Sequence, residues 1–143
     1  MPETTAADSR SRGSFVPVLG RLQLVLLRAS DLERSARFYR ELLGVPLEPG
    51  DNRRPGDPWI GGGHHEYSWR DSYLHFSIYP GTAQEHTCGA HIGFEVEHLQ
   101  SMHRRLVEAE VPVLHEPRAE PWGMTARYTD PDGNVVELVE PKR

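Results

Sequence analysis

Residues 24–32 have the sequence LVLLRASDL, and residues 91–99 have the sequence HIGFEVEHL. Each stretch starts with an alternation of side chains that predicts a strand, and each ends where the helical spacing of apolar residues begins. Weaker matches follow in the same order, between residues 45–47 and 111–113 and between residues 72–76 and 134–138. Their similar offsets indicate an internal duplication, so the sequence predicts two halves of like structure.

The elements around these stretches are expected in the order strand, helix, strand, strand, strand in each half. Ser30 and Glu33 form an S-x-x-E capping box, which is typical of a helix start, and Gly44 stands where a helix end is expected. The turn at residues 130–133 predicts a hairpin and needs only turn chemistry. The expected strands are 21–28, 45–48, 66–70, 72–79, 90–96, 111–115, 124–129 and 134–140, and the expected helices are 31–43 and 98–110.

These elements predict an α+β fold in which two βαβββ modules form a paired, partly open mixed-sheet barrel around a cavity. The modules are expected at about residues 20–80 and 89–141, within a single domain of residues 20–143. Residues 1–19 are rich in Thr, Ser, Asp and Arg, and are predicted to form a flexible arm. Pro and Gly residues predict a long loop at residues 49–64.

The composition excludes several classes of function. The 143 residues carry a net charge of −5, which argues against the basic face of a general nucleic-acid or anionic-membrane binder. No apolar run approaches the ~20 residues of a membrane span, and no apolar stretch near the N-terminus predicts a signal peptide. Cys88 is the only cysteine, so we expect no disulfide framework and a reducing, cytoplasmic location. Metal chemistry would therefore rest on carboxylates and the eight histidines.

Three potential metal ligands are predicted to point into the cavity. Successive strand residues face opposite sides, and the apolar set of each strand is expected to face a helix. The opposite faces then carry His75, His91 and Glu137. Two imidazoles and one carboxylate suit one divalent ion such as zinc, nickel, iron or manganese. The alternative is that each histidine is packed and hydrogen-bonded, and that Glu137 is solvated on an open sheet face.

Other side chains are predicted to bind the substrate. Arg28 lies on the inward face and suits a carboxylate or phosphate, although an ion pair with a carboxylate such as Glu95 is the alternative. Aromatic residues, Tyr67 and Trp69 among them, suit a ring or an apolar body, with ordinary core packing as the alternative. The residues assigned to substrate binding are Leu24, Arg28, Tyr73 and Trp122.

With these motifs the sequence resembles the vicinal oxygen chelate superfamily, which includes glyoxalase I, bleomycin-resistance proteins, fosfomycin-resistance enzymes and extradiol dioxygenases. The resemblance covers about residues 21–141, and its motifs are typical of the fold rather than of one reaction. The resembling stretches are SDLERS at 30–35 with FY at 38–39, LLG at 42–44, HIGFEV at 91–96, PWG at 121–123 and DPDGNVVEL at 130–138.

The resemblance implies metal ligands on the first and last strands of each half. His91 and Glu137 fall on such positions, and His75 falls where glyoxalase I has a carboxylate. Leu24 occupies the first-strand position that is usually His in metal-dependent members, which puts glyoxalase I activity in doubt.

Two functions are therefore compared below. The first is a divalent-metal-dependent lyase or isomerase whose small substrate is chelated through adjacent oxygens. The second is a metal-free protein that sequesters a small molecule or antibiotic, as bleomycin-resistance proteins do. Either function implies a small-molecule partner, and the resemblance also implies a homodimer.

Overall fold

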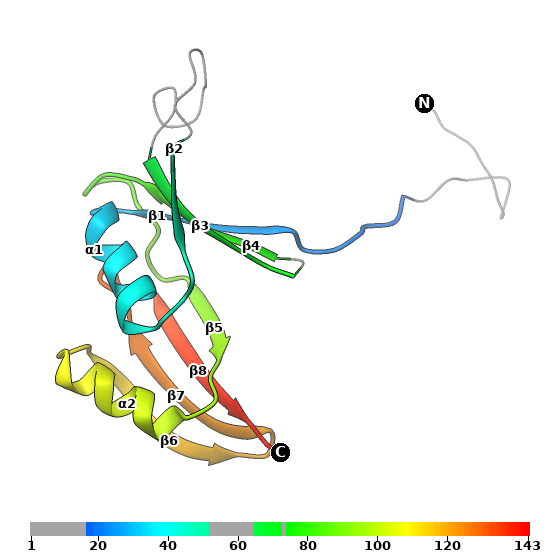
Figure 1. Cartoon of the computed structure of the whole chain (residues 1–143), viewed down its shortest axis with the longest axis vertical. Coiled ribbons are helices and arrows are strands. Elements are labelled where there is room, and N and C mark those ends of the chain that lie inside the picture. The colour runs from blue at the N-terminus through cyan, green and yellow to red at the C-terminus, as the bar shows by residue number, and fades with distance from the viewer. Residues whose placement is uncertain (1–16, 52–64, 73) are drawn as a thin grey trace, which may run out of the picture.

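The computed structural model describes residues 17–51, 65–72 and 74–143, and these residues form two βαβββ modules (Figure 1). The first α-helix continues directly into a π-helical segment, η1. The first module consists of β1 (Leu24–Ala29), α1 (Leu32–Ala36), η1 (Arg37–Leu42), β2 (Glu48–Asp51), β3 (His65–Asp71) and β4 (Leu74–Pro80). The second consists of β5 (His91–Glu95), α2 (Leu99–Glu108), β6 (Val113–Glu120), β7 (Gly123–Thr129) and β8 (Val135–Pro141).

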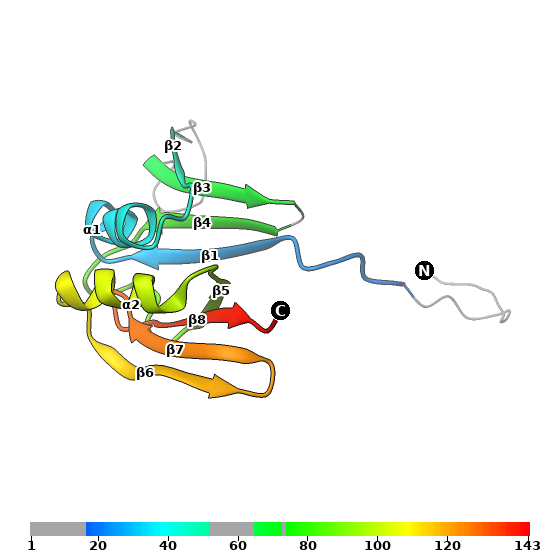
Figure 2. The ribbon, with the colours of Figure 1, turned by 60° about the horizontal axis from the view of Figure 1, so that its bottom comes forward.

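Each module forms its own four-stranded sheet, with the orders β1-β4-β3-β2 and β5-β8-β7-β6. The first strand of each module pairs in parallel with the last, and the other pairs are antiparallel. Both helices lie side by side over the sheets (Figures 1 and 2). The prediction of two like modules with mixed sheets that do not close is therefore confirmed. Neither described helix is long and apolar enough to cross a membrane.

The start of the first helix differs from the prediction. Asp31 is the N-cap, and its Oδ1 accepts a hydrogen bond from the backbone N–H of Arg34 at 3.1 Å. Ser30 donates instead to Asp132 of the second module, and the Glu33 carboxylate accepts from the Tyr67 hydroxyl at 2.8 Å. The capping-box prediction was wrong because both of its side chains find partners outside the helix.

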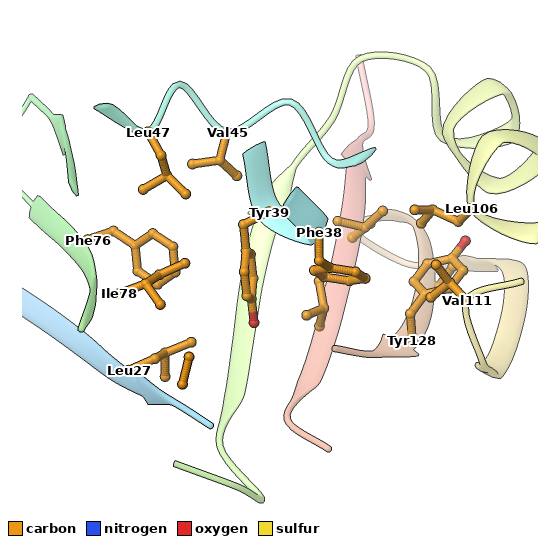
Figure 3. Close-up of a cluster of buried hydrophobic side chains, with 14 of the residues drawn as sticks. Leu27, Phe38, Tyr39, Val45, Leu47, Phe76, Ile78, Leu106, Val111 and Tyr128 are labelled. Atoms are coloured by element: carbon orange, nitrogen blue, oxygen red, sulfur yellow. The ribbon is translucent and has the colours of Figure 1, made fainter. Parts of the chain in front are cut away.

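The core is continuous between the modules. The ring of Tyr39 on η1 lies 5.5 Å from that of Phe76 and 6.3 Å from that of Phe94, and these two rings are 5.8 Å apart. Figure 3 shows Tyr39 and Phe38 between the first sheet and the Leu106, Val111 and Tyr128 side chains of the second module. Burying a large apolar side chain contributes about 1.5–3 kcal/mol, so these aromatic rings hold the modules together.

The turn between β7 and β8 adds a polar connection between the modules. The buried Asp130 accepts hydrogen bonds from the Tyr39 hydroxyl at 2.6 Å and from the backbone N–H of Asn134 at 2.9 Å. Asp132 accepts from both the backbone N–H and the hydroxyl of Ser30. Burial and the Asp130 carboxylate raise the pKa of Tyr39 well above its usual range, so its hydroxyl stays protonated and donates. The turn therefore also connects the two modules, a role that the sequence did not predict.

Candidate functional site

His91 and Glu137, two of the predicted metal ligands, lie together on the second sheet. They come from the adjacent strands β5 and β8, and the distance from His91 Nε2 to Glu137 Oε1 is 3.0 Å. The same carboxylate oxygen accepts a hydrogen bond from Arg127 Nε on β7 at 2.9 Å. Glu137 is thus held between an imidazole and a guanidinium on the sheet face away from the helices.

These contacts set the ionisation of Glu137. Burial alone would raise the pKa of its carboxyl, but the hydrogen bonds from His91 and Arg127 outweigh burial, and the net effect lowers the pKa. Arg127 also stabilises the carboxylate by its charge. The Glu137 side chain is 21% exposed and remains charged at neutral pH. Its charge is balanced by the Arg127 guanidinium of the same chain.

His75, the third predicted ligand, lies on the first sheet. On β4 it pairs with Leu24 of β1 and with Arg70 of β3. It lines a surface hollow with Glu48 and Ser68 from neighbouring strands of the same sheet. The structure therefore brings two of the three predicted ligands together and leaves the third on a different sheet.

The predicted substrate-binding residues do not form one cluster in the described chain. Leu24 is 44% exposed at the start of β1, and Trp122 is 59% exposed beside the β6–β7 turn. Tyr73 lies outside the described residues. The backbone N–H of Arg28 donates to the Thr87 hydroxyl at 2.8 Å, and its carbonyl accepts from the Thr87 backbone N–H at 2.8 Å. The Arg28 guanidinium lies 4.0 Å from Glu85.

Arg28 shows two features that sequence reasoning did not anticipate. Its ion-pair partner is Glu85, on the loop after β4, rather than the Glu95 considered from the repeat. Its Nε is buried and has no hydrogen-bond partner among the described residues.

A cavity of about 470 Å³ lies between the first sheet and β5. The sequence predicts a cavity on the sheet faces away from the helices, whereas this one lies on the helix side of the first sheet. Trp69 and Phe76 line it from the first sheet, and Phe94 lines it from β5. Asp71 and Glu95 place carboxylates on its wall. This volume falls in the range of about 300–1,000 Å³ that is typical of small-molecule sites. The mixture of aromatic rings with a few polar groups is also typical of such sites.

The cavity lies on the helix side of the first sheet. Trp69 and Phe76 face that side, as the buried Ile78 does, and Trp69 is only half-buried. The strand alternation from Tyr67 through Trp69 to Asp71 was the available signal. It places two rings and a carboxylate on one face of β3.

The family model for the Glyoxalase/Bleomycin resistance protein/Dioxygenase superfamily matches residues 21–138. The chain belongs to this superfamily. Comparison with curated proteins finds no match.

Solved structures of this superfamily share the fold. TnmS3 from Streptomyces sp. CB03234, described as an antibiotic binding protein, is 23% identical, with a TM-score of 0.64 over 89% of this chain and 100% of that one. UcmS2 is 21% identical, with a TM-score of 0.61 over 86% of this chain and 99% of that one. A superfamily member from Sphaerobacter thermophilus DSM 20745 is 22% identical, with a TM-score of 0.60 over 85% of this chain and 98% of that one. At these identities the likeness shows the fold alone.

Some members of this superfamily bind a metal, and the described residues supply only part of the predicted three-ligand site. His91 and Glu137 are adjacent, but the third predicted donor lies on the other sheet and the first-strand position holds Leu24. Across residues 17–51, 65–72 and 74–143, no group of three or more His, Cys, Asp or Glu side chains could hold a metal ion. Within one chain, the described donors do not fit the predicted three-ligand site.

Proposed function

We propose that this superfamily member binds a small aromatic molecule and sequesters it without using a metal. The observation that carries the proposal is the cavity between the modules, where Trp69, Phe76 and Phe94 offer ring surfaces to a ligand. A ligand that stacks on such rings gains about 0.5–1.5 kcal/mol per aromatic pair beyond the burial of its area. Binding there needs no catalytic group.

The surroundings of Glu137 support the same proposal. Its Oε1 already has contacts with both Arg127 and His91, so a metal at that oxygen would compete with both of them. Leu24 supplies an apolar side chain where a metal-dependent relative would carry a ligand. The TnmS3 structure described as an antibiotic binding protein makes an antibiotic a reasonable ligand class to test first.

The first test is tryptophan fluorescence of the untagged protein titrated with bleomycin and with a neutral fused-ring compound such as acridone. We expect saturable quenching that is unchanged by EDTA and is lost in Trp69→Leu. Trp122→Phe is the matched control, because Trp122 is exposed and does not line the cavity. Quenching that disappears with EDTA contradicts metal-free binding.

A metal-dependent lyase or isomerase is the second candidate, favoured by the 3.0 Å contact between His91 and Glu137. Elemental analysis of the parent protein, His91→Ala and Glu137→Ala tests it after reconstitution with zinc, nickel, iron and manganese. About one metal per chain in the parent, lost in both variants, would replace the proposal of metal-free binding. No metal in any of the three proteins supports it.

We also infer a homodimer. Val18, Leu19 and Leu22, just before β1, are 91%, 95% and 70% exposed. They lead into an edge strand of the first sheet, and a second copy would cover both the edge and the apolar side chains. Light scattering of Leu19→Ser combined with Leu22→Ser is expected to show monomers where the parent shows dimers. A parent that is monomeric at all concentrations contradicts this inference.

A further inference from the structure

The cavity between the modules carries more charge than ligand sequestration alone requires. Asp71 lies on its wall at the end of β3, two residues after Trp69 and therefore on the same strand face. Glu95 lies on the wall at the end of β5, next to Phe94. Two carboxylates from different modules thus border a space whose other side chains are apolar.

Neither carboxylate has a side-chain partner among residues 17–51, 65–72 and 74–143. The structure gives neither Asp71 nor Glu95 a side-chain hydrogen bond or an ion pair with any residue in the described part of the chain. This contrasts with Glu137, whose carboxylate is neutralised by Arg127 at 2.9 Å. The described residues that line the cavity include no Lys, Arg or His. Two negative charges therefore act on this cavity without a cation from its own wall.

The apolar lining determines which cation suits the site. A small inorganic ion has no apolar body to bury against Trp69, Phe76 and Phe94, and the described residues hold no group of three acidic or histidine donors for a metal. An organic cation gains from both features, because its body stacks on the rings while its charge faces the carboxylates. Indole and phenyl faces also attract positive charge directly.

We propose that the cavity between the modules binds an aromatic ligand with a protonated amine, and that Asp71 and Glu95 bind the amine. This inference rests on the proposed function and names its ligand class. The rings of Trp69, Phe76 and Phe94 contact the fused or single ring of the ligand. The two carboxylates discriminate against neutral and anionic relatives of the same shape.

The test uses three fused-ring probes that differ mainly in charge: 9-aminoacridine as the cation, acridone as the neutral compound and acridine-9-carboxylate as the anion. Titration calorimetry with the full chain at pH 7 gives each affinity. We expect 9-aminoacridine to bind at least about tenfold more tightly than acridone, since one charge-assisted contact corresponds to about a factor of ten. Acridine-9-carboxylate should bind most weakly.

Substitutions that remove charge without changing shape assign the effect to the two residues. Asp71→Asn and Glu95→Gln should each weaken 9-aminoacridine binding by about three- to tenfold and leave acridone binding unchanged. Glu108→Gln on α2 is the matched control, because Glu108 is exposed and does not line the cavity. Raising the salt concentration from about 50 mM to about 500 mM should weaken the binding of 9-aminoacridine and leave the binding of acridone unchanged, since the carboxylates lie within reach of solvent.

The possible failures are distinguishable. Equal affinities for 9-aminoacridine and acridone, unchanged in both variants, overturn the charge assignment while the proposed function stands. If none of the three acridine probes binds but bleomycin still quenches the fluorescence of Trp69, the proposed ligand class is wrong and the proposal of sequestration stands. If neither bleomycin nor any acridine affects Trp69, both proposals fail.

Discussion

Two pairs of acidic side chains lie near the contact between the modules, and their surroundings differ. Asp130 and Asp132, in the turn after β7, are nearly inaccessible and accept hydrogen bonds from Tyr39 and Ser30 of the first module. Asp71 and Glu95 also face each other's module, but they border a cavity and have no described partner. The first pair is saturated by the chain itself, whereas the second is available to a ligand.

The difference shows that an acidic residue is structural or functional according to what its neighbours donate. In the turn, hydroxyl and backbone N–H donors converge on each carboxylate, so its desolvation is offset. At the cavity, both carboxylates belong to exposed residues, and no side chain of the described residues donates a hydrogen bond to either of them. Four variants test this contrast, and they follow in order of decreasing effect on stability.

Asp130→Ala is expected to have the largest effect. It removes the acceptor of the Tyr39 hydroxyl and of the Asn134 backbone N–H, leaving both donors buried and unpaired. Each such group costs about 1–3 kcal/mol, so we expect the free energy of unfolding to fall by about 3 kcal/mol or more. Urea denaturation measures the change. Tyr39→Phe, which keeps the ring, should cost less, and an Asp130→Ala effect below that of Tyr39→Phe would contradict the saturated turn.

Asp132→Ala should have an intermediate effect. It removes both hydrogen bonds from Ser30, one of them from the backbone at 2.9 Å, at the entrance to α1. We expect a loss of about 1–2 kcal/mol in the same denaturation experiment. Ser30→Ala is the control, because it removes the hydroxyl donor and keeps the backbone donor. It should cost less than Asp132→Ala, and the reverse order would show that the backbone contact contributes little.

The fold was predictable because it depends on a pattern that repeats. Strand alternation and helical spacing occur twice in the same order, and the observed modules follow that order with shifted ends. The strand faces were predictable too: Leu27 and Phe76 are buried toward the helix, while His75 and His91 lie on the opposite face.

The site was less predictable because it depends on distances between the two sheets. Strand alternation gives the face on which His75 lies but not its separation from His91, and the two lie on different sheets. It also gives no sign of the space between the first sheet and β5 that forms the cavity beside Trp69. The cross-module role of Asp130 was missed for the same reason, since its Tyr39 partner is distant in sequence.

Glu137→Gln tests a fifth carboxylate, which is intermediate between the two pairs because it is paired but partly exposed. Hydrogen bonds from His91 and Arg127 lower its pKa below the ordinary value of 4.5 despite burial. A carboxyl with a lower pKa in the folded state contributes stability above the unfolded pKa and loses it as the pH falls through the folded pKa.

Thermal unfolding scans from pH 7 down to about pH 3 measure this effect. The parent should lose more stability below pH 4.5 than Glu137→Gln does, and at neutral pH the variant should be less stable by below about 1 kcal/mol, as for other partly exposed pairs. Parallel acid profiles for the two proteins would show that the ion pair does not stabilise the fold.

The combined variant Asp71→Asn and Glu95→Gln should have the smallest effect on stability and the largest on ligand binding. Neither side chain has a partner to lose in the described part of the chain, so the free energy of unfolding should stay within about 0.5 kcal/mol of the parent value. The same variant should lose most of the preference for 9-aminoacridine over acridone. Urea denaturation and calorimetry on one preparation give both quantities. A loss of stability comparable to that of Asp132→Ala would show that the cavity carboxylates have structural partners, and the contrast between the two acidic pairs would fail.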